Sequence, residues 1–294
     1  MKKLTLITHD GTFHTDDVFA CATLSLVFTD REIEIVRTRD EHDIARGDIV
    51  FDVGGVYDPA NGRFDHHQKG GAGARDNGIP YASFGLVWKE YGHMVAGSVE
   101  NAAFIDEQLV QGIDGADTGA VDRVADKGVY VYSIIDTITA FRPTWEEDKS
   151  LFDAFTEAVS FARMIIGRLV QHATSFKNAE HLLERAYQQA SDKQIIDIGI
   201  EYPGWYEVMA RYPEPLFVVH QRTDGKWSVK AVRQNPAEFP VRKKLPASWL
   251  GLRDQELAQV SKVLDAVFCH NEGFIAVART REGALALAKN AVES

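Results

Sequence analysis

The sequence predicts an α/β protein of two domains: a largely parallel sheet flanked by helices over residues 1–192, and a smaller C-terminal α+β domain over residues 193–294. Short apolar runs alternate with a helix-length segment at the start of the chain, an order typical of parallel sheets. A long helical middle separates them from a second group of strand-like segments. The length of 294 residues also suits two domains, at about 100–200 residues each.

The elements of the N-terminal sheet follow in chain order. Residues 4–8 form an apolar run that ends in polar residues from His9 onward, as expected where a strand meets a loop. A helix is expected from Asp16, because its acidic first residues interact favourably with the helix dipole. Residues 33–36 and 48–52 predict two further strands. The dipeptide Asn61-Gly62 predicts a hairpin turn after them.

Helical patterning dominates the middle of the chain and strand patterning its end. After a Gly-rich loop, helices are expected over residues 83–91, 151–172 and 176–191. The C-terminal domain is expected to contain strands over residues 216–220, 227–232, 266–269 and 274–278. A closing helix over residues 281–292 would be capped by Thr280.

Composition limits the class of protein. A formal net charge of −11 argues against a general nucleic-acid coat, which needs a basic face. It does not exclude an enzyme acting on phosphate esters, because bound cations change the local sign of the charge. Cys21 and Cys269 lie far apart and give no disulfide framework. No apolar run approaches the ~20 residues that span a bilayer, so we expect a cytoplasmic protein with no membrane partner, and a homo-oligomer stays open.

Histidines and aspartates gather where the predicted strands end and helices begin. The carboxyl ends of strands in an open α/β sheet form the ligand crevice, so these segments can converge. So many acidic groups would repel one another unless cations neutralised them, and imidazole with carboxylate suits manganese, zinc or iron. The residues are His9, Asp10, His14, Asp16, Asp17, Asp52, Asp65, His66, His67, Asp114 and Asp117.

Two metal ions close together can activate water and clamp a phosphoryl group during its displacement. The sequence contains no nucleophile elbow, no HExxH and no P-loop, so hydrolysis by a metal-bound water is the expected mechanism. Plainer interpretations exist: a single histidine at a strand end is more often structural, and Asp16 and Asp17 alone are ordinary helix-start charges. The tripeptide Asp65-His66-His67 favours metal binding, because its side chains cannot all face one core.

That tripeptide gives the DHH phosphoesterase superfamily its name, and the chain resembles this superfamily. Residues 8–14, 37–40, 52–59 and 63–68 are similar to one branch, the melanocyte-proliferating-gene family, also catalogued as "metal-dependent protein hydrolases". Its eukaryotic member is described as a 3′–5′ RNA exonuclease. The similarity continues through residues 245–254, 270–274 and 280–284, and so covers nearly the whole chain.

The resemblance implies two divalent ions, with Mn²⁺ expected and Mg²⁺, Zn²⁺ or Fe²⁺ as alternatives. The ligands that it implies for the first ion are His9, His14 and Asp52. Those for the second are Asp16, the bridging Asp52, His66 and Asp117, with Asp114 as the alternative to Asp117. His67 would face the phosphate, and Asp65 and Asp10 are further catalytic candidates. One departure leaves the metal preference open: the superfamily usually has an aspartate where His14 stands.

We therefore expect a hydrolase of phosphoester or phosphodiester bonds, a 3′–5′ exonuclease or phosphatase acting on short single-stranded RNA or nucleotides. Two other functions stay open: hydrolysis of peptides, as the family label suggests, and a metal- and nucleotide-binding sensor without turnover. In the C-terminal domain, residues 230–244 carry a locally positive charge. The candidate substrate-binding residues there are Arg233, His270, Gly273 and Arg279.

Overall fold

The computed structural model describes residues 3–121 and 128–294. The chain divides into two compact units, Met1–Thr174 and Ser175–Ser294, and the division falls inside helix α7 (Leu151–Gln189). The two roles expected from the sequence, metal binding before residue 192 and substrate binding after it, stay predictions. No helix of the described ranges has both the length and the apolar character needed to cross a bilayer.

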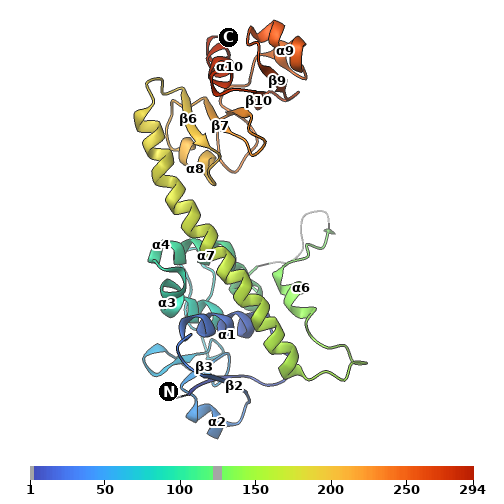
Figure 1. The fold of residues 1–294 in the computed structure, drawn as a ribbon. Coiled ribbons are helices and arrows are strands. Elements are labelled where there is room, and N and C mark those ends of the chain that lie inside the picture. Colours follow the sequence, from blue (N-terminus) through green and yellow to red (C-terminus); the bar gives the residue numbers. More distant parts are fainter. Residues whose placement is uncertain (1–2, 122–127) are drawn as a thin grey trace. The chain divides into compact units, whose positions relative to one another are not determined.

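Unit 1 contains a five-stranded, largely parallel sheet, which confirms the predicted fold class (Figure 1). The strand order is β2-β1-β3-β5-β4. Only β4 runs antiparallel, because it forms the predicted hairpin with β5. The strands are β1 (Leu4–Thr8), β2 (Ile33–Arg37), β3 (Ile49–Phe51), β4 (Tyr57–Asp58) and β5 (Arg63–Phe64).

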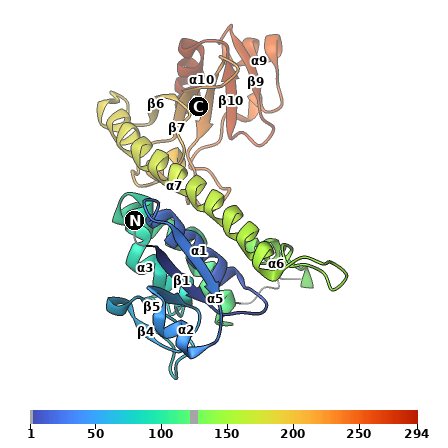
Figure 2. The ribbon, with the colours of Figure 1, turned by 60° about the horizontal axis from the view of Figure 1, so that its bottom comes forward.

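Helix α1 (Thr15–Val27) is buried along most of its length, and α3 (Ser83–Ala96) packs against it (Figure 2). Its sequence explains this burial, since Val18 to Leu24 is apolar around nearly the whole helix. Large aromatic side chains such as Phe19 and Phe84 fill the contact. Further helices in the described part of this unit are α2 (Glu41–Arg46), α4 (Val99–Ile105), the π-helical η2 (Asp106–Val110), α5 (Gln111–Asp117) and α6 (Ile134–Thr139).

Helix α7 is one continuous helix of 39 residues, whereas the sequence predicted two. The expected break lay between residues 172 and 176, where Ala173, Thr174 and Ser175 interrupt the pattern of large apolar residues. None of these residues is glycine or proline, so nothing there removes a backbone hydrogen bond or opens the helix. A gap in the apolar pattern therefore did not end the helix.

Unit 2 is α+β, with a sheet in the order β6-β7-β8-β10-β9. Only the β6–β7 pair is parallel. The predicted strands are confirmed to within a residue or two, and Thr280 caps the closing helix through its hydroxyl. The sequence missed β6, α8 and α9. The elements are β6 (Ile195–Ile200), α8 (Trp205–Ala210), β7 (Phe217–Gln221), β8 (Trp227–Ala231), α9 (Asp254–Ser261), β9 (Ala266–Cys269), β10 (Ile275–Ala278) and α10 (Arg281–Glu293).

Candidate metal centre

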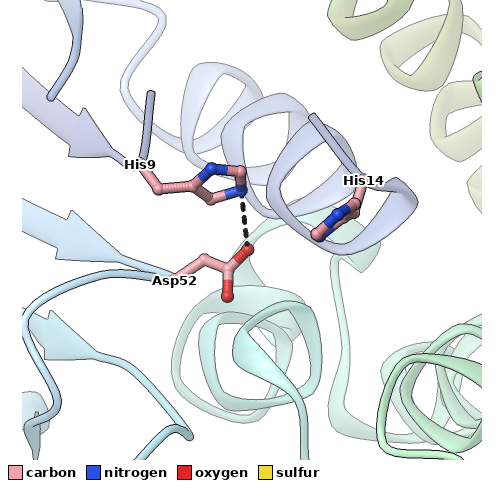
Figure 3. A group of neighbouring side chains, drawn as sticks. All are labelled: His9, His14 and Asp52. Carbon is pink, nitrogen blue, oxygen red and sulfur yellow. Dashed lines mark ion pairs between the residues drawn. The ribbon is translucent and has the colours of Figure 1, made fainter. Parts of the chain in front are cut away.

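The predicted histidines and aspartates of unit 1 meet at the carboxyl ends of β1 and β3. His9 directly follows β1 and Asp52 directly follows β3, and these strands pair in parallel. His14 stands at the N-cap of α1, where the chain returns to the same edge. His9 Nε2 lies 3.4 Å from Asp52 Oδ2, and Figure 3 shows the two side chains pointing toward each other beside His14.

Three groups of side chains bring their ligand atoms within 4.8 Å of one another, close enough to share an ion. Asp52 and His66 each belong to two of these groups, so the groups form a connected series. They are His9, His14 and Asp52; Asp52, His66 and His67; and Asp16, His66 and Asp117. A connected set of this kind can hold more than one divalent ion.

The third group is built from elements far apart in the chain. Asp16 is fully buried, and its two oxygens accept hydrogen bonds from the backbone N–H groups of Ser83 and Phe84 at the start of α3. Asp117 ends α5, and its Oδ2 lies 3.4 Å from His66 Nε2. Asp16 is therefore held by backbone donors, which leaves its orientation fixed.

His67 is held by its neighbour Asp65. The His67 Nδ1 atom lies 2.7 Å from Asp65 Oδ1, and Asp65 Oδ2 accepts the N–H of Gly55. Burial raises the pKa of Asp65, but these hydrogen bonds outweigh it and hold the pKa below its ordinary value. The His67 side chain is 62% exposed, so its ring is oriented by a buried carboxylate while facing outward. Whether it contacts metal or phosphate stays a prediction.

The crowding of buried carboxylates fits bound cations. Burial and the charges of Asp52 and Asp117 raise the pKa of Asp16 well above its ordinary value. Burial also raises the pKa of Asp117, and that of Asp17 to about 7. His9 Nε2 and Asp52 Oδ1 are buried without a hydrogen-bond partner among the described residues. Mixed imidazole and carboxylate donors in this state suit a transition-metal ion.

Two pockets open beside these groups, each with a volume of about 320 Å³, and His14 lines both. The first is lined by Arg39, His67 and the Gly54-Gly55 backbone around the His9 group. The second adds apolar walls to Asp16 and Asp117: Ile113, Ala116 and Ile135, with Thr139 and Arg142 beside them.

Besides Asp65 and Asp17, the predicted residues Asp10 and Asp114 lie outside the three groups. Asp10 is 55% exposed and pairs with Arg39 at 3.1 Å. Asp114 is buried, and its Oδ2 lies 2.8 Å from Arg75 Nη1. Among the described residues, the groups able to hold a metal thus include Asp117 and not Asp114.

Three residues outside the expected ligand set shape the site, and two of them, Arg37 and Arg142, were not among the sequence candidates. Asp17, taken as a helix-start charge, lies 3.3 Å from His9 Nε2, and its other oxygen accepts the N–H of His14. Arg37 donates to Gly11 O, and Arg142 donates to the carbonyl of the residue before His14. Both arginines therefore pin the loop between the two histidines. The fully buried side chain of Asp17 gave no sequence signal that separates it from an exposed cap residue.

The candidate substrate residues of unit 2 do not form one cluster. His270 and Gly273 belong to the β9–β10 turn, where the His270 ring contacts Phe274. Arg233 lies beside Tyr206 and Phe239 in cation–π geometry and donates to a backbone carbonyl. Arg279 follows the far end of β10 and pairs with Asp254.

The chain matches known proteins over almost its full length. The family model named MYG1 exonuclease, described as an uncharacterised protein family (UPF0160), matches residues 5–292. The human "MYG1 exonuclease" is 33% identical over 317 residues, which cover 96% of this chain and 84% of that protein. The "MYG1 protein" of Dictyostelium discoideum is 32% identical, with 98% and 96% covered.

A solved structure also matches, although weakly. The crystal structure of RecJ in complex with Mn²⁺ from Thermus thermophilus aligns with all of this chain and 52% of that chain, at 12% identity and a TM-score of 0.29. A likeness this low supports no inference about function. The family model and the sequence relatives show that the chain belongs to the MYG1 family, the family that its sequence motifs resemble.

Proposed function

We propose that this protein is a metal-dependent phosphoesterase that removes nucleotides from the 3′ end of short single-stranded RNA. The observation that carries the proposal is the connected series of ligand groups joined by Asp52 and His66. A bridging carboxylate between two imidazole-bearing groups is the donor set that a two-ion hydrolase needs. The naming of mammalian relatives as exonucleases supports a nucleic-acid substrate.

In this proposal His9, His14 and Asp52 hold one ion, and Asp16, Asp52, His66 and Asp117 hold the other. When bound, the ions would acidify a water molecule and neutralise charge on the phosphate, and manganese is the expected ion. Binding and orientation of the substrate would fall to side chains beside the ligand groups.

His67 is placed to act on the reacting phosphate. Asp65 fixes its ring through Nδ1, which leaves Nε2 as the atom that holds or gives a proton. Arg39 lines the same pocket and can grip a phosphate oxygen if it leaves Asp10. A phosphate ester carries a negative charge that Arg39 and bound metal ions would attract, whereas a peptide bond is neutral, so a phosphate ester suits this pocket better than a peptide.

A screen of substrates tests the proposal. Chelator-treated protein would be supplied with Mn²⁺, Mg²⁺ or Zn²⁺ and given a simple aryl phosphate, a dinucleotide, short RNA, short DNA and a peptide mixture. We expect turnover of dinucleotide and RNA with manganese, and a ladder that shortens a 5′-labelled RNA one nucleotide at a time. Peptide cleavage, or nucleotide binding without turnover under any metal, would contradict it.

A further inference from the structure

A buried arginine outside the ligand groups holds the helix that carries Asp117. Arg75 ends the Gly-rich loop after the Asp65-His66-His67 tripeptide, and its side chain is 7% exposed. Its Nε and Nη2 atoms donate to the two oxygens of Asp106, at 2.9 and 2.7 Å. Its third nitrogen, Nη1, lies 2.8 Å from Asp114 Oδ2. The guanidinium thus joins two carboxylates from neighbouring segments, η2 and α5.

Both oxygens of Asp114 are already engaged. Oδ2 faces Arg75, and Oδ1 accepts the backbone N–H of Gly85 in α3 at 3.0 Å. A Cβ atom at position 85 would lie only 1.8 Å from Asp114 Oδ2. Glycine is therefore required there for the carboxylate to reach the helix backbone. Asp114 therefore ties α5 to α3 and to Arg75, and it stands in none of the groups that could hold a metal among the described residues.

This contact joins the two elements that fix the third ligand group. Asp114 and Asp117 lie one turn apart on α5, and the first turn of α3 binds Asp16 through Ser83 and Phe84. Asp16 and Asp117 belong to the same ligand group, so their separation depends on how α5 is held against the start of α3, which binds Asp16. The ion pair at Arg75 braces this contact, because it neutralises the carboxylate that ties the two helices together.

We propose that Arg75 is a positioning residue of the ligand group Asp16, His66 and Asp117: through Asp114 it sets the distance between α5 and α3. The proposal rests on the two-metal function above. It separates the two ions, since the group of His9, His14 and Asp52 has no contact with Arg75 among the described residues. Loss of Arg75 should therefore lower the affinity for the ion bound by Asp16, His66 and Asp117, and leave the affinity for the other ion unchanged.

The test measures manganese binding to the full-length, chelator-treated protein by calorimetric titration and elemental analysis. Wild type should bind two ions. Arg75→Gln leaves Asp114 buried without a cation, and we expect one ion bound as in wild type and the second at least ~10-fold more weakly. The double variant Arg75→Gln/Asp114→Asn removes the orphaned charge but keeps an acceptor for the Gly85 N–H, so it should recover much of the second site.

The double variant decides between a brace and a ligand. If Asp114 were a ligand, Arg75→Gln/Asp114→Asn would bind the second ion worse than Arg75→Gln alone, and the proposal would be overturned. Binding of both ions by Arg75→Gln with the affinities of wild type would overturn the proposal as well. No metal bound by wild type would instead overturn the two-metal function itself.

Two further variants control for folding. Arg75 and Lys89 both lie over the Tyr81 ring, 4.4 and 5.0 Å from its centre. Among the described contacts Asp114 pairs with Arg75 and not with Lys89, so Lys89→Gln removes a cation from the same ring without touching that ion pair. It should bind both ions as wild type does. Should Arg75→Gln fail to fold, Arg75→Lys keeps a charge near Asp114 without the forked contact to Asp106. Arg75→Lys should fold, and it should bind the second ion more weakly than wild type but less weakly than Arg75→Gln would. A wild-type affinity for the second ion in Arg75→Lys would contradict the role of Arg75.

Discussion

Asp17 sits where a histidine and an arginine meet behind the metal centre. Its Oδ2 lies 3.3 Å from His9 Nε2 and 3.8 Å from Arg37 Nη2. Burial raises its pKa from 3.8 to about 7, against the opposing charge of His9. The folded protein therefore holds this proton more tightly than the unfolded chain does. Between pH ~4 and ~7 the contribution of Asp17 to stability falls as the pH rises.

The first prediction concerns this pH dependence. Metal-free protein should have a higher melting temperature at pH 5 than at pH 8, because the folded-state pKa of His9 is raised too and adds a change of the same sign. Calorimetric scans in the presence of a chelator measure it. Asp17→Asn should flatten the curve between these pH values, whereas the exposed control Asp10→Asn should not. A curve equally steep in Asp17→Asn would contradict the assignment.

The second prediction separates a ligand from a residue that faces substrate. Asp52→Ala should lose metal and activity together, since Asp52 belongs to two ligand groups. His67→Ala should keep most of its metal and lose turnover, by ~10²–10³-fold if it stabilises charge in the transition state. Because His67 also stands in one of the groups, metal content decides the matter. Loss of metal in His67→Ala as complete as in Asp52→Ala would make His67 a ligand.

At the scale of the element, two glycines in helices should respond in opposite ways to alanine. Alanine in a helix interior is favoured over glycine by about 1 kcal/mol. In α7, a Cβ at Gly167 meets nothing within 4 Å, so Gly167→Ala should stabilise the protein by about that amount. In α3, Gly85→Ala should destabilise it, since the new Cβ would collide with Asp114. Urea unfolding of both variants measures the difference, and stabilisation by both would refute the close approach.

The elements that sequence predicted well are those with a local signal. A short apolar run marked β1, the dipeptide Asn61-Gly62 marked the hairpin of β4 and β5, and Thr280 marked the start of α10. Contacts between distant segments had no such signal. Arg75 and Asp106 lie 31 residues apart, and nothing in either segment announces that they pair. The continuity of α7 was missed for the converse reason: a local change in pattern was given more weight than the absence of any helix breaker.

At the scale of the molecule, bound metal should stabilise the fold. Ligand that binds only the folded state raises stability with its concentration, by about 2.7 kcal/mol at one hundred times Kd. Manganese should thus raise the melting temperature of chelator-treated protein progressively. Magnesium should do so less, because imidazole ligands suit it poorly. Equal shifts by calcium, a pure oxygen binder, would indicate a carboxylate site unlike the one proposed.

Substrate recognition by unit 2 is a sequence-based hypothesis that variants of single residues can test. If the residues of the β9–β10 turn bind substrate, His270→Ala should raise KM for a dinucleotide and leave metal content unchanged. Arg279→Ala should do the same, although Arg279 lies at the other end of β10. Arg222→Ala, an exposed arginine paired with Asp224 in the same unit, is the control. Unchanged KM in both His270→Ala and Arg279→Ala would move recognition to other residues.

Whole-chain recognition from sequence succeeded because the family's motifs are long and linked, from residue 8 to residue 284. Ligand identity was harder. Asp114 and Asp117 stand in the same short segment, and only the three-dimensional positions of Arg75 and Gly85 distinguish them. The choice between two neighbouring carboxylates depends on which one has other partners, and that is a property of the fold.

Asp52 has a left-handed backbone, with φ at 54°. Asparagine, aspartate and glycine tolerate this conformation best among the common residues, while only aspartate among them offers a charged oxygen to each of the two proposed ions. A saturation library at this codon, scored separately for cellular abundance and for catalysis, should therefore split into two tiers of failure. Asparagine and glycine should yield abundant but inert protein, and β-branched residues should yield protein that is both scarce and inert. The library would thus separate two selection pressures at one position: the backbone conformation, read from abundance, and the metal-binding carboxylate, read from catalysis.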